Sequence, residues 1–209
     1  FRRPKTRTDG KFIILFPGGF QWHQGLDLAI EAFARIKDRV PNAELHLYGS
    51  GPMQEDLSRL TQNLGVGDRV KFFNGVNLEQ ISSVIANADL GVVPKRADSF
   101  GNEAYSTKIM EFMSQGIPVV ASRTAIDSFY FNDTQVRFFT SGDVEDLSQA
   151  MLDVIENPPV RESLIAAALQ YVARHNWDVR KRDYWELVDS LTTESFNSVG
   201  KTVTMDRFP

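Results

Sequence analysis

The stretch Phe12–Tyr48, FIILFPGGFQWHQGLDLAIEAFARIKDRVPNAELHLY, contains the pattern that decides the fold. It opens with an apolar run at 12–16 and closes with a second strand-like run, AELHLY, at 43–48. Between them, apolar residues recur at spacings of three and four, as in an amphipathic helix. A strand, a helix and a strand in this order predict a right-handed crossover and parallel pairing.

The same alternation continues along the chain. Further strands are predicted at 70–73, 90–93, 117–121 and 135–139, and helices at 26–40, 52–65, 78–86, 106–115 and 144–156, with a short helix near Ala125. Two more helices, at 160–174 and 179–191, follow breaks at 157–159 and 175–177. The pattern predicts an α/β fold: a three-layer α/β/α, Rossmann-like domain around a mostly parallel sheet of about six strands.

The two ends of the chain are polar. FRRPKTRTDG, residues 1–10, has no hydrophobic periodicity and is interpreted as an interdomain linker, with one domain over 11–191 and a C-terminal tail over 192–209. For the basic residues Arg2, Arg3, Lys5 and Arg7 two interpretations stay open, contact with a membrane surface or simple solvation.

Composition narrows the classes of partner. The 209 residues carry a net charge of −4, with a pI near 5.4, which disfavours nucleic acid as the main partner. The chain has no cysteine, so neither disulfides nor thiolate metal sites are expected. No apolar run reaches the roughly 20 residues of a membrane span, and no signal peptide is recognisable. We therefore expect a cytoplasmic protein, with membrane association open for a full-length form.

The loops after the strands are the expected place for a ligand, because open parallel sheets bind at the carboxyl ends of their strands. The most informative segment is PKRADSFGNEAYSTKIMEFMSQGIPVVAS, at 94–122. Ser106 or Thr107 can cap the helix that follows, whose N-terminal N–H groups favour phosphate. Glu103 and Glu111 are eight residues apart, and a carboxylate there can accept hydrogen bonds from two hydroxyls of a ribose or sugar.

This segment resembles the E-x7-E region of the retaining GT-B glycosyltransferases of group 1 (GT4). Glu103 and Glu111 match the two glutamates, and Gly116–Ser122, GIPVVAS, matches the family's G-x-P-V-V-A-S. Pro17–Gly19 with Gln24–Asp27 resembles the family's first loop and helix, and Leu45–Gly51 its second strand and turn. The resemblance covers roughly residues 11–190 in the correct order.

The resemblance implies a function. The chain would be the nucleotide-sugar-binding half of a GT-B glycosyltransferase active in polysaccharide biosynthesis, moving a sugar from a nucleoside-diphosphate sugar to a glycan or lipid-linked acceptor. Glu103 would face the transferred sugar as the catalytic residue, and Glu111 would bind the ribose. The residues expected to bind the donor are Gly18, Gly19, His23, Lys95, Glu103, Ala104, Tyr105, Ser106, Thr107, Lys108 and Glu111.

The resemblance also implies what lies beside this domain. Neither a metal nor another cofactor is expected, and the acceptor would be held by an N-terminal domain of the same enzyme. This domain alone is therefore expected to bind the donor without transferring the sugar. Two alternatives stay open: a GT-B-fold sugar-nucleotide epimerase, and a nucleotide-binding α/β module without transfer chemistry. The base, the sugar and the acceptor are not readable from the sequence.

The first loop departs from the family pattern. Arg and Lys commonly hold the diphosphate there, whereas this chain has Gly19 and Gln24. Lys108, Lys95 or a protonated His23 could supply the charge.

Large aromatic residues also stand in or near the predicted loops. Phe20 and Trp22 either pack locally or cover the sugar cleft or the other domain. A further aromatic group is expected to pack or, being dense near a sheet end, to reach the base of the nucleotide: Phe129, Tyr130, Phe131, Phe138 and Phe139.

Overall fold

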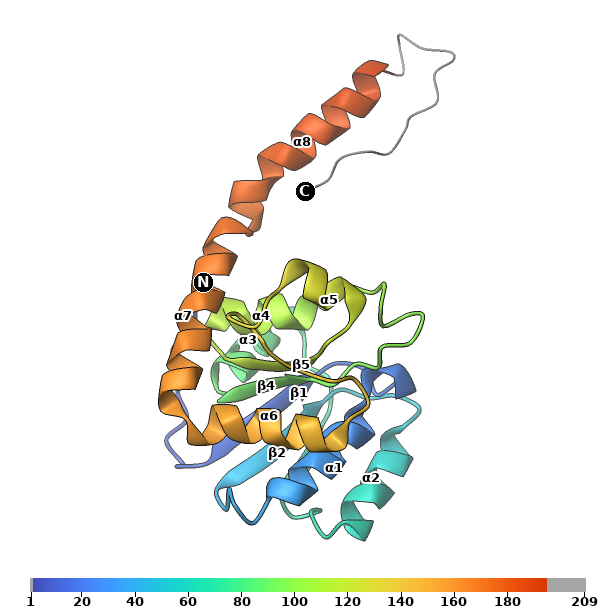
Figure 1. The fold of residues 1–209 in the computed structure, drawn as a ribbon, viewed down its shortest axis with the longest axis vertical. Helices are drawn as coiled ribbons and strands as arrows, with labels where there is room; N and C mark the ends of the chain where they lie inside the picture. The colour runs from blue at the N-terminus through green and yellow to red at the C-terminus, as the bar shows by residue number, and fades with distance from the viewer. Residues whose placement is uncertain (1, 195–209) are drawn as a thin grey trace. The chain divides into compact units, whose positions relative to one another are not determined.

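The computed structural model describes residues 2–194 and divides the chain into two units, Phe1–Val172 and Ala173–Pro209 (Figure 1). The first unit alternates strands and helices. Its elements are β1 Phe12–Pro17, α1 Leu26–Ile36, β2 Ala43–Tyr48, α2 Gln54–Asn63, β3 Val70–Phe73, α3 Leu78–Ala86, β4 Leu90–Val93, α4 Thr107–Gln115, β5 Val119–Ser122, α5 Ala125–Tyr130, β6 Arg137–Phe139, α6 Val144–Glu156 and all but the last two residues of α7 Pro158–Arg174.

The strands form one parallel sheet in the order β3-β2-β1-β4-β5-β6. β1 pairs with β2 from Phe12 opposite Ala43 to Pro17 opposite Tyr48, and with β4 at Ile14 opposite Leu90. The strand order reverses between β1 and β4. In sheets of this kind, such a reversal opens a crevice beyond the carboxyl ends of the strands, where ligands bind.

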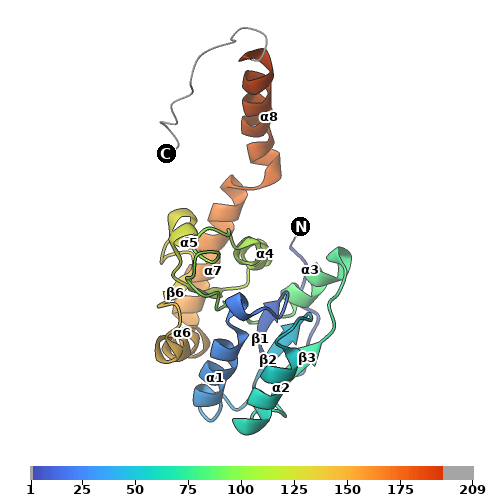
Figure 2. The ribbon, with the colours of Figure 1, turned by 90° about the vertical axis from the view of Figure 1, so that its right-hand side faces the viewer.

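Helices cover both faces of the sheet. α1, α2 and α6 lie on one face and α3 and α4 on the other, as two views at right angles show (Figures 1 and 2). Ile30 and Phe33 of α1 are fully buried on the first face, and Phe112 and Met113 of α4 are fully buried on the second. The predicted three-layer α/β/α architecture is therefore confirmed.

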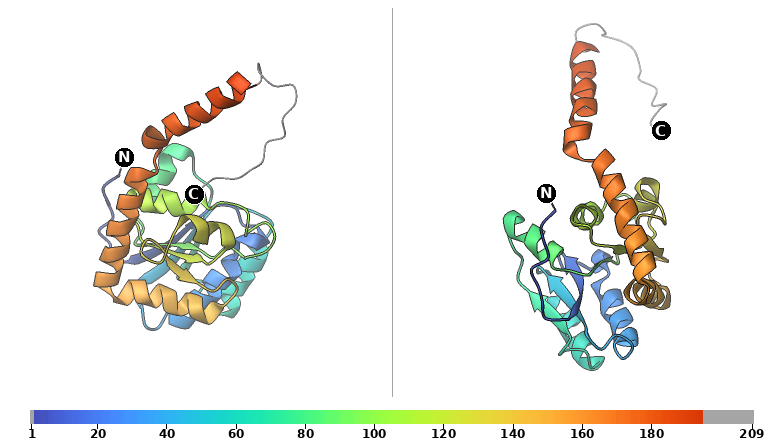
Figure 3. Two further views of the ribbon diagram at one scale, coloured as in Figure 1. Left: turned by 45° about the horizontal axis from the view of Figure 1, so that its top comes forward. Right: turned by 90° about the vertical axis from the view of Figure 1, so that its left-hand side faces the viewer.

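Two helices, α1 and α7, have boundaries that differ from those predicted by the spacing of apolar residues. Pro158 and Pro159 begin α7 instead of only ending α6, because proline fits the first turn of a helix, where its missing N–H has no partner to lose. The chain turns sharply there, between α6 and α7 (Figure 3). α1 ends at Ile36 instead of Val40, whose N–H still bonds to the Ile36 carbonyl at 3.2 Å.

The second unit contains α8, Trp177–Glu194, which confirms the helix predicted at 179–191. Its aromatic side chains contact one another along the helix, with ring centroids 5.7 Å apart for Trp177 and Tyr184 and 5.8 Å apart for Tyr184 and Trp185. All three are more than half exposed, at 61%, 51% and 57%. The predicted tail at 192–209 lies outside the described residues from 195 onward.

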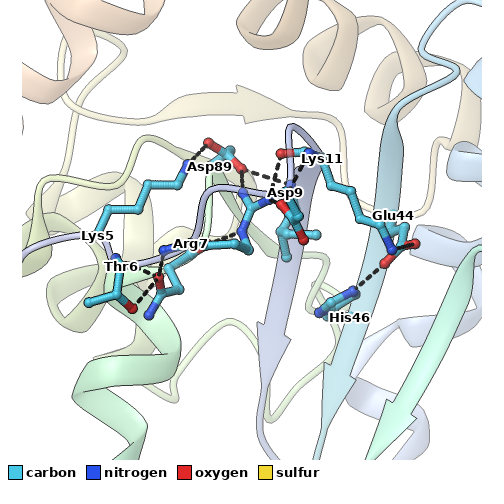
Figure 4. Close-up of polar contacts among 10 residues, drawn as sticks. Lys5, Thr6, Arg7, Asp9, Lys11, Glu44, His46 and Asp89 are labelled. Carbon is cyan, nitrogen blue, oxygen red and sulfur yellow. Dashed lines mark hydrogen bonds and ion pairs between the residues drawn. The ribbon is translucent and has the colours of Figure 1, made fainter.

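The segment before β1 has no regular secondary structure but is held by side chains (Figure 4). The backbone N–H groups of Thr6 and Arg7 both donate to Asn87 Oδ1 at 2.9 Å, and the Arg7 guanidinium forms an ion pair with Asp89. Arg2 Nε donates to the Gln115 carbonyl at 3.1 Å. The residues predicted as a linker are thus fastened to the ends of α3 and α4, and their role between domains stays a prediction.

Candidate functional site

A cavity of about 450 Å³ opens at the carboxyl edge of the sheet, beside the point where the strand order reverses. It is lined by the loops after β1, β2 and β3 and by the first turns of α3 and α4. The lining residues are Pro17, Gly18, Gly19, Tyr48, Gly49, Ser50, Gly75, Val76, Leu78, Ile81, Thr107, Lys108 and Glu111. Five predicted site residues are therefore brought together here: Gly18, Gly19, Thr107, Lys108 and Glu111.

Glycine is required where the first two loops meet. Gly18 has φ of 150° and donates its N–H to the Tyr48 carbonyl at 2.8 Å. A Cβ at Gly18 would lie 2.5 Å from Lys108 Cε, and a Cβ at Gly49 would lie 1.9 Å from the Gly18 carbonyl oxygen. The backbone can approach Lys108 only because these side chains are absent.

Lys108 supplies the cation of this cavity. Its Nζ donates to Gln24 Oε1 at 3.2 Å and lies 5.3 Å from the centre of the Phe16 ring. Within the described part of the chain, its ammonium forms no ion pair. Burial lowers the pKa of Lys108, while the nearby Glu111 carboxylate opposes that shift. A partly buried cation without an ion-pair carboxylate is a favourable place for an anionic ligand.

The first turn of α4 adds neutral hydrogen-bond donors. Among residues 2–194, none accepts a hydrogen bond from the backbone N–H of Thr107 or Lys108. Glu111 is exposed one turn further along, at the cavity wall. The wall therefore combines N–H donors and a cation, which suit phosphate, with a carboxylate, which suits paired hydroxyls.

Lys95 has a different environment from the one predicted. It is 4% exposed, and its ammonium lies 2.9 Å from Asp127 Oδ2 and donates to the Ala104 carbonyl at 2.6 Å. The structure does not bring this side chain to the cavity, because a buried carboxylate holds it elsewhere. Ser106 does not cap α4 with its side chain, as predicted for it or Thr107, because its hydroxyl donates to Asp127 at 3.0 Å.

The other predicted donor-binding residues lie outside the cavity lining. Glu103 is exposed, and its N–H donates to the Phe100 carbonyl at 3.1 Å. The His23 ring packs against Phe100, with centroids 4.8 Å apart. Ala104 accepts the hydrogen bond from Lys95, while Tyr105 packs against Tyr130 at 4.9 Å. Donor contacts by these four residues stay predictions.

The aromatic residues divide between packing and exposure. Phe20 is fully buried, so it packs locally, whereas Trp22 is 55% exposed. Packing is confirmed for Phe131, Phe138 and Phe139, which are at most 2% exposed. Phe129 and Tyr130 are not core residues, since they are 68% and 44% exposed on the short helix α5, although their rings contact each other with centroids 5.0 Å apart.

Two contacts that shape the site carry no signal in the sequence. Arg96 binds Asp27 through two hydrogen bonds of 3.0 and 2.6 Å, and its guanidinium lies 4.4 Å from the centre of the Trp22 ring. This contact joins the loop after β4 to the start of α1. Asp127 likewise reaches Ser106 across 21 residues, from α5 to the residue before α4.

Two other kinds of functional feature, a metal site and a membrane span, are not found in residues 2–194. Residues 2–194 contain no cluster of three or more His, Asp or Glu side chains that could hold a metal ion. None of the helices there is long and apolar enough to cross a membrane.

Comparison with known proteins identifies the family of this chain. Residues 1–171 match the family model described as glycosyl transferases group 1. A curated relative, the GDP-mannose-dependent alpha-(1-6)-phosphatidylinositol monomannoside mannosyltransferase of Mycolicibacterium smegmatis, is 30% identical over 162 residues, which is 76% of this chain and 42% of that protein. The chain belongs to the group 1 glycosyltransferase family.

Solved structures share the fold. Sucrose-phosphate synthase from Thermosynechococcus elongatus superposes with a TM-score of 0.77 at 24% identity, covering 88% of this chain and 46% of that one. HepE from Anabaena, in complex with UDP and glucose, superposes with a TM-score of 0.76 at 21% identity, covering 88% and 48%. These neighbours are GT-B glycosyltransferases, and the chain spans about half of their length.

Proposed function

We propose that the cavity beside α4 binds a nucleoside-diphosphate sugar, as the donor site of a retaining glycosyltransferase. The observation that carries the proposal is the setting of Lys108, a partly buried cation in the cavity lining that packs against Gly18 and has no ion-pair partner in the described chain. An anion there would gain a charge-assisted hydrogen bond without competing with a protein carboxylate.

Each wall of the cavity matches one part of such a donor. Lys108 and the N–H groups at the start of α4 would hold the diphosphate, and Glu111 would accept hydrogen bonds from the ribose hydroxyls. The loop after β3 and the start of α3 supply apolar lining, through Val76, Leu78 and Ile81. Glu103 would contact the transferred sugar, which must then extend beyond the cavity toward the loop before α4.

The same groups would assist the reaction. As the bond between the sugar and the diphosphate breaks, negative charge grows on the departing phosphate. A fixed cation and N–H dipoles stabilise that charge most where they are held in place in advance. Transfer with retention would place the acceptor oxygen on the face of the sugar that the diphosphate leaves.

The rest of the reaction needs surfaces that lie outside this chain. The chain covers 42% of the Mycolicibacterium smegmatis relative and 46% of the Thermosynechococcus elongatus structure. We propose that a further domain of the same protein holds a glycan or lipid-linked acceptor, so that this chain alone binds the donor without transfer. A cytoplasmic location and peripheral membrane contact also stay predictions.

A thermal-shift screen with UDP-, GDP-, ADP- and dTDP-sugars tests the donor assignment. A ligand at 100 times its Kd should raise the free energy of unfolding by about 2.7 kcal/mol. For a chain of this length, that corresponds to a Tm increase of about 5–10 °C. If none of the four donors shifts the transition at millimolar concentration, the donor assignment is wrong.

A further inference from the structure

Asp127 is a buried carboxylate with an unusually complete set of partners. It lies on α5 and is 1% exposed. Its two oxygens accept hydrogen bonds from the Ser106 N–H at 3.2 Å, the Ser106 hydroxyl at 3.0 Å and the Thr124 hydroxyl at 2.9 Å, and Lys95 Nζ lies 2.9 Å away. A carboxylate is buried at this depth only when such partners replace its hydration.

These contacts converge on the segment just before α4. Two of the four donors belong to Ser106 itself. Lys95 also donates to the carbonyl of Ala104 at 2.6 Å. Both members of the ion pair therefore hydrogen-bond to residues 104–106. The residues of α5 that follow Asp127, 128–130, are exposed. The Asp127 contacts therefore do not hold the end of α5 against the core.

The contacts also change what the start of α4 offers to a ligand. A serine at this position ordinarily accepts a hydrogen bond from one of the first N–H groups of its helix. Here Asp127 draws the Ser106 hydroxyl away, and the N–H groups of Thr107 and Lys108 have no acceptor within residues 2–194. They stay available beside the cavity that Thr107 and Lys108 line.

We propose that Asp127, paired with Lys95, is a positioning residue for the diphosphate of the donor. It fixes Ser106 so that the first N–H groups of α4 and the Lys108 ammonium face the cavity. This inference rests on the proposed donor site and assigns to it a group that the ligand does not touch.

The ion pair also controls the local charge. A lone carboxylate near the start of α4 would repel a diphosphate, whereas a carboxylate matched by Lys95 adds no net charge. Both members of the pair interact electrostatically with Lys108, Asp127 favouring its charged form and Lys95 opposing it. The pair therefore holds the segment without weakening the attraction of Lys108 for an anion.

The test compares a nucleoside diphosphate with its nucleoside, using the 209-residue chain. The diphosphate is the one among UDP, GDP, ADP and dTDP that binds the wild type most tightly by calorimetry, and the nucleoside is followed by ligand-observed NMR. Asp127→Asn should lower diphosphate affinity on the order of 10-fold, a change of about 1.4 kcal/mol, and leave nucleoside affinity unchanged. The double variant Lys95→Met, Asp127→Ala should do the same without leaving an unpaired buried lysine.

Two further variants separate positioning from general destabilisation. Asp153→Asn removes a carboxylate that binds Arg137 at 2.7 Å between β6 and α6, outside the cavity lining, and should leave both affinities unchanged. Ser106→Ala keeps the ion pair and should lower diphosphate affinity by a smaller factor, which Ser106→Thr restores. This pair supplies the comparison if the Asp127 variants do not fold.

The outcomes distinguish the two proposals. If the wild type binds none of the four diphosphates, the donor site itself is wrong. If the wild type binds but the preference for diphosphate over nucleoside is unchanged in folded Asp127 or Ser106 variants, the positioning role of Asp127 is overturned and the donor site stands. A merely structural Asp127 would lower the Tm without changing that preference.

Discussion

The surroundings of Lys95 and of Lys108 differ in one decisive respect, although both lysines lie at the carboxyl edge of the sheet. Lys95 is 4% exposed and is neutralised by Asp127 at 2.9 Å. Lys108 is also partly buried, but its hydrogen-bond partner is the neutral Gln24. The comparison shows that the side chain opposite each lysine, an aspartate for Lys95 and an amide for Lys108, decides which of the two forms a buried ion pair.

The largest effect is expected from removing the partner of Lys95. Asp127→Ala leaves a buried ammonium without a carboxylate and should lower the free energy of unfolding by about 3–5 kcal/mol. Urea denaturation followed by circular dichroism measures this value. Lys108→Met is the matched variant and should change stability by less than about 1 kcal/mol, because it breaks no ion pair. Equal losses in the two variants would remove the distinction between the lysines.

The next effect concerns binding at Lys108. Lys108→Met should weaken nucleoside diphosphate binding by about 1.5–3 kcal/mol, the range for a hydrogen bond to a charged group. Calorimetry with the diphosphate selected in the screen measures this loss. Binding of the nucleoside should stay unchanged, and a similar loss for both ligands would assign Lys108 to packing.

A smaller loss is expected from closing the approach between the first loop and Lys108. Gly18→Ala introduces a side chain at φ of 150° and 2.5 Å from Lys108 Cε. It should cost about 1–2 kcal/mol of stability and displace the ammonium. Gly142→Ala is the control, since Gly142 has φ of 86° and open space around its Cβ position. Gly142→Ala should lose stability but keep its diphosphate affinity. If Gly18→Ala binds the diphosphate as tightly as the wild type, the proposed contact between Lys108 and the diphosphate is contradicted.

Glu111→Gln tests the carboxylate of the cavity wall. The amide can still accept one hydrogen bond from a ribose hydroxyl, so the expected loss is only about 1 kcal/mol of binding free energy. The effect should vanish with a ligand that lacks both ribose hydroxyls. An equal loss with that ligand would separate Glu111 from the ribose.

The smallest effect is a pH dependence. Burial lowers the pKa of Lys108, so the folded chain releases this proton at lower pH than the unfolded chain, in which a lysine keeps its ordinary pKa of 10.5. Between the two pKa values the unfolded state binds more protons than the folded state, so the contribution of Lys108 to the free energy of unfolding rises with pH. Diphosphate affinity falls over the same range, because the ammonium loses its charge. Lys108→Arg should keep its affinity across this range. Calorimetry from about pH 7 to pH 10 measures the difference, and identical profiles would exclude Lys108 as the titrating group.

The fold class was predictable from the sequence because the alternation of strands and helices, which implies a parallel sheet, is carried by local signals. The run at 12–16, the helical spacing after Leu26 and the run at 43–48 are each readable within a few residues. The part of the site on regular elements was predictable for the same reason: Lys108 and Glu111 lie on one helix, and Gly18 directly follows a strand.

The loop between β4 and α4 was not predictable in the same way. Its course depends on Arg96 binding Asp27 across 69 residues and on Ser106 binding Asp127 across 21. Such contacts have no periodicity and no fixed spacing. Glu103 is predicted in the site by its match to the family's E-x7-E motif, and His23 and Lys95 as possible replacements for the first-loop cations. The long-range contacts decide where these side chains lie.

The attachment of residues 2–7 also has a mechanical consequence. Tension applied upstream of Arg2 would reach Gln115, Asn87 and Asp89 before it reached β1. The load would be spread over the ends of α3 and α4, and the central strand would be shielded from being peeled out of the sheet. We therefore expect force spectroscopy to show an early, low-force event for this segment, followed by the main rupture of the sheet.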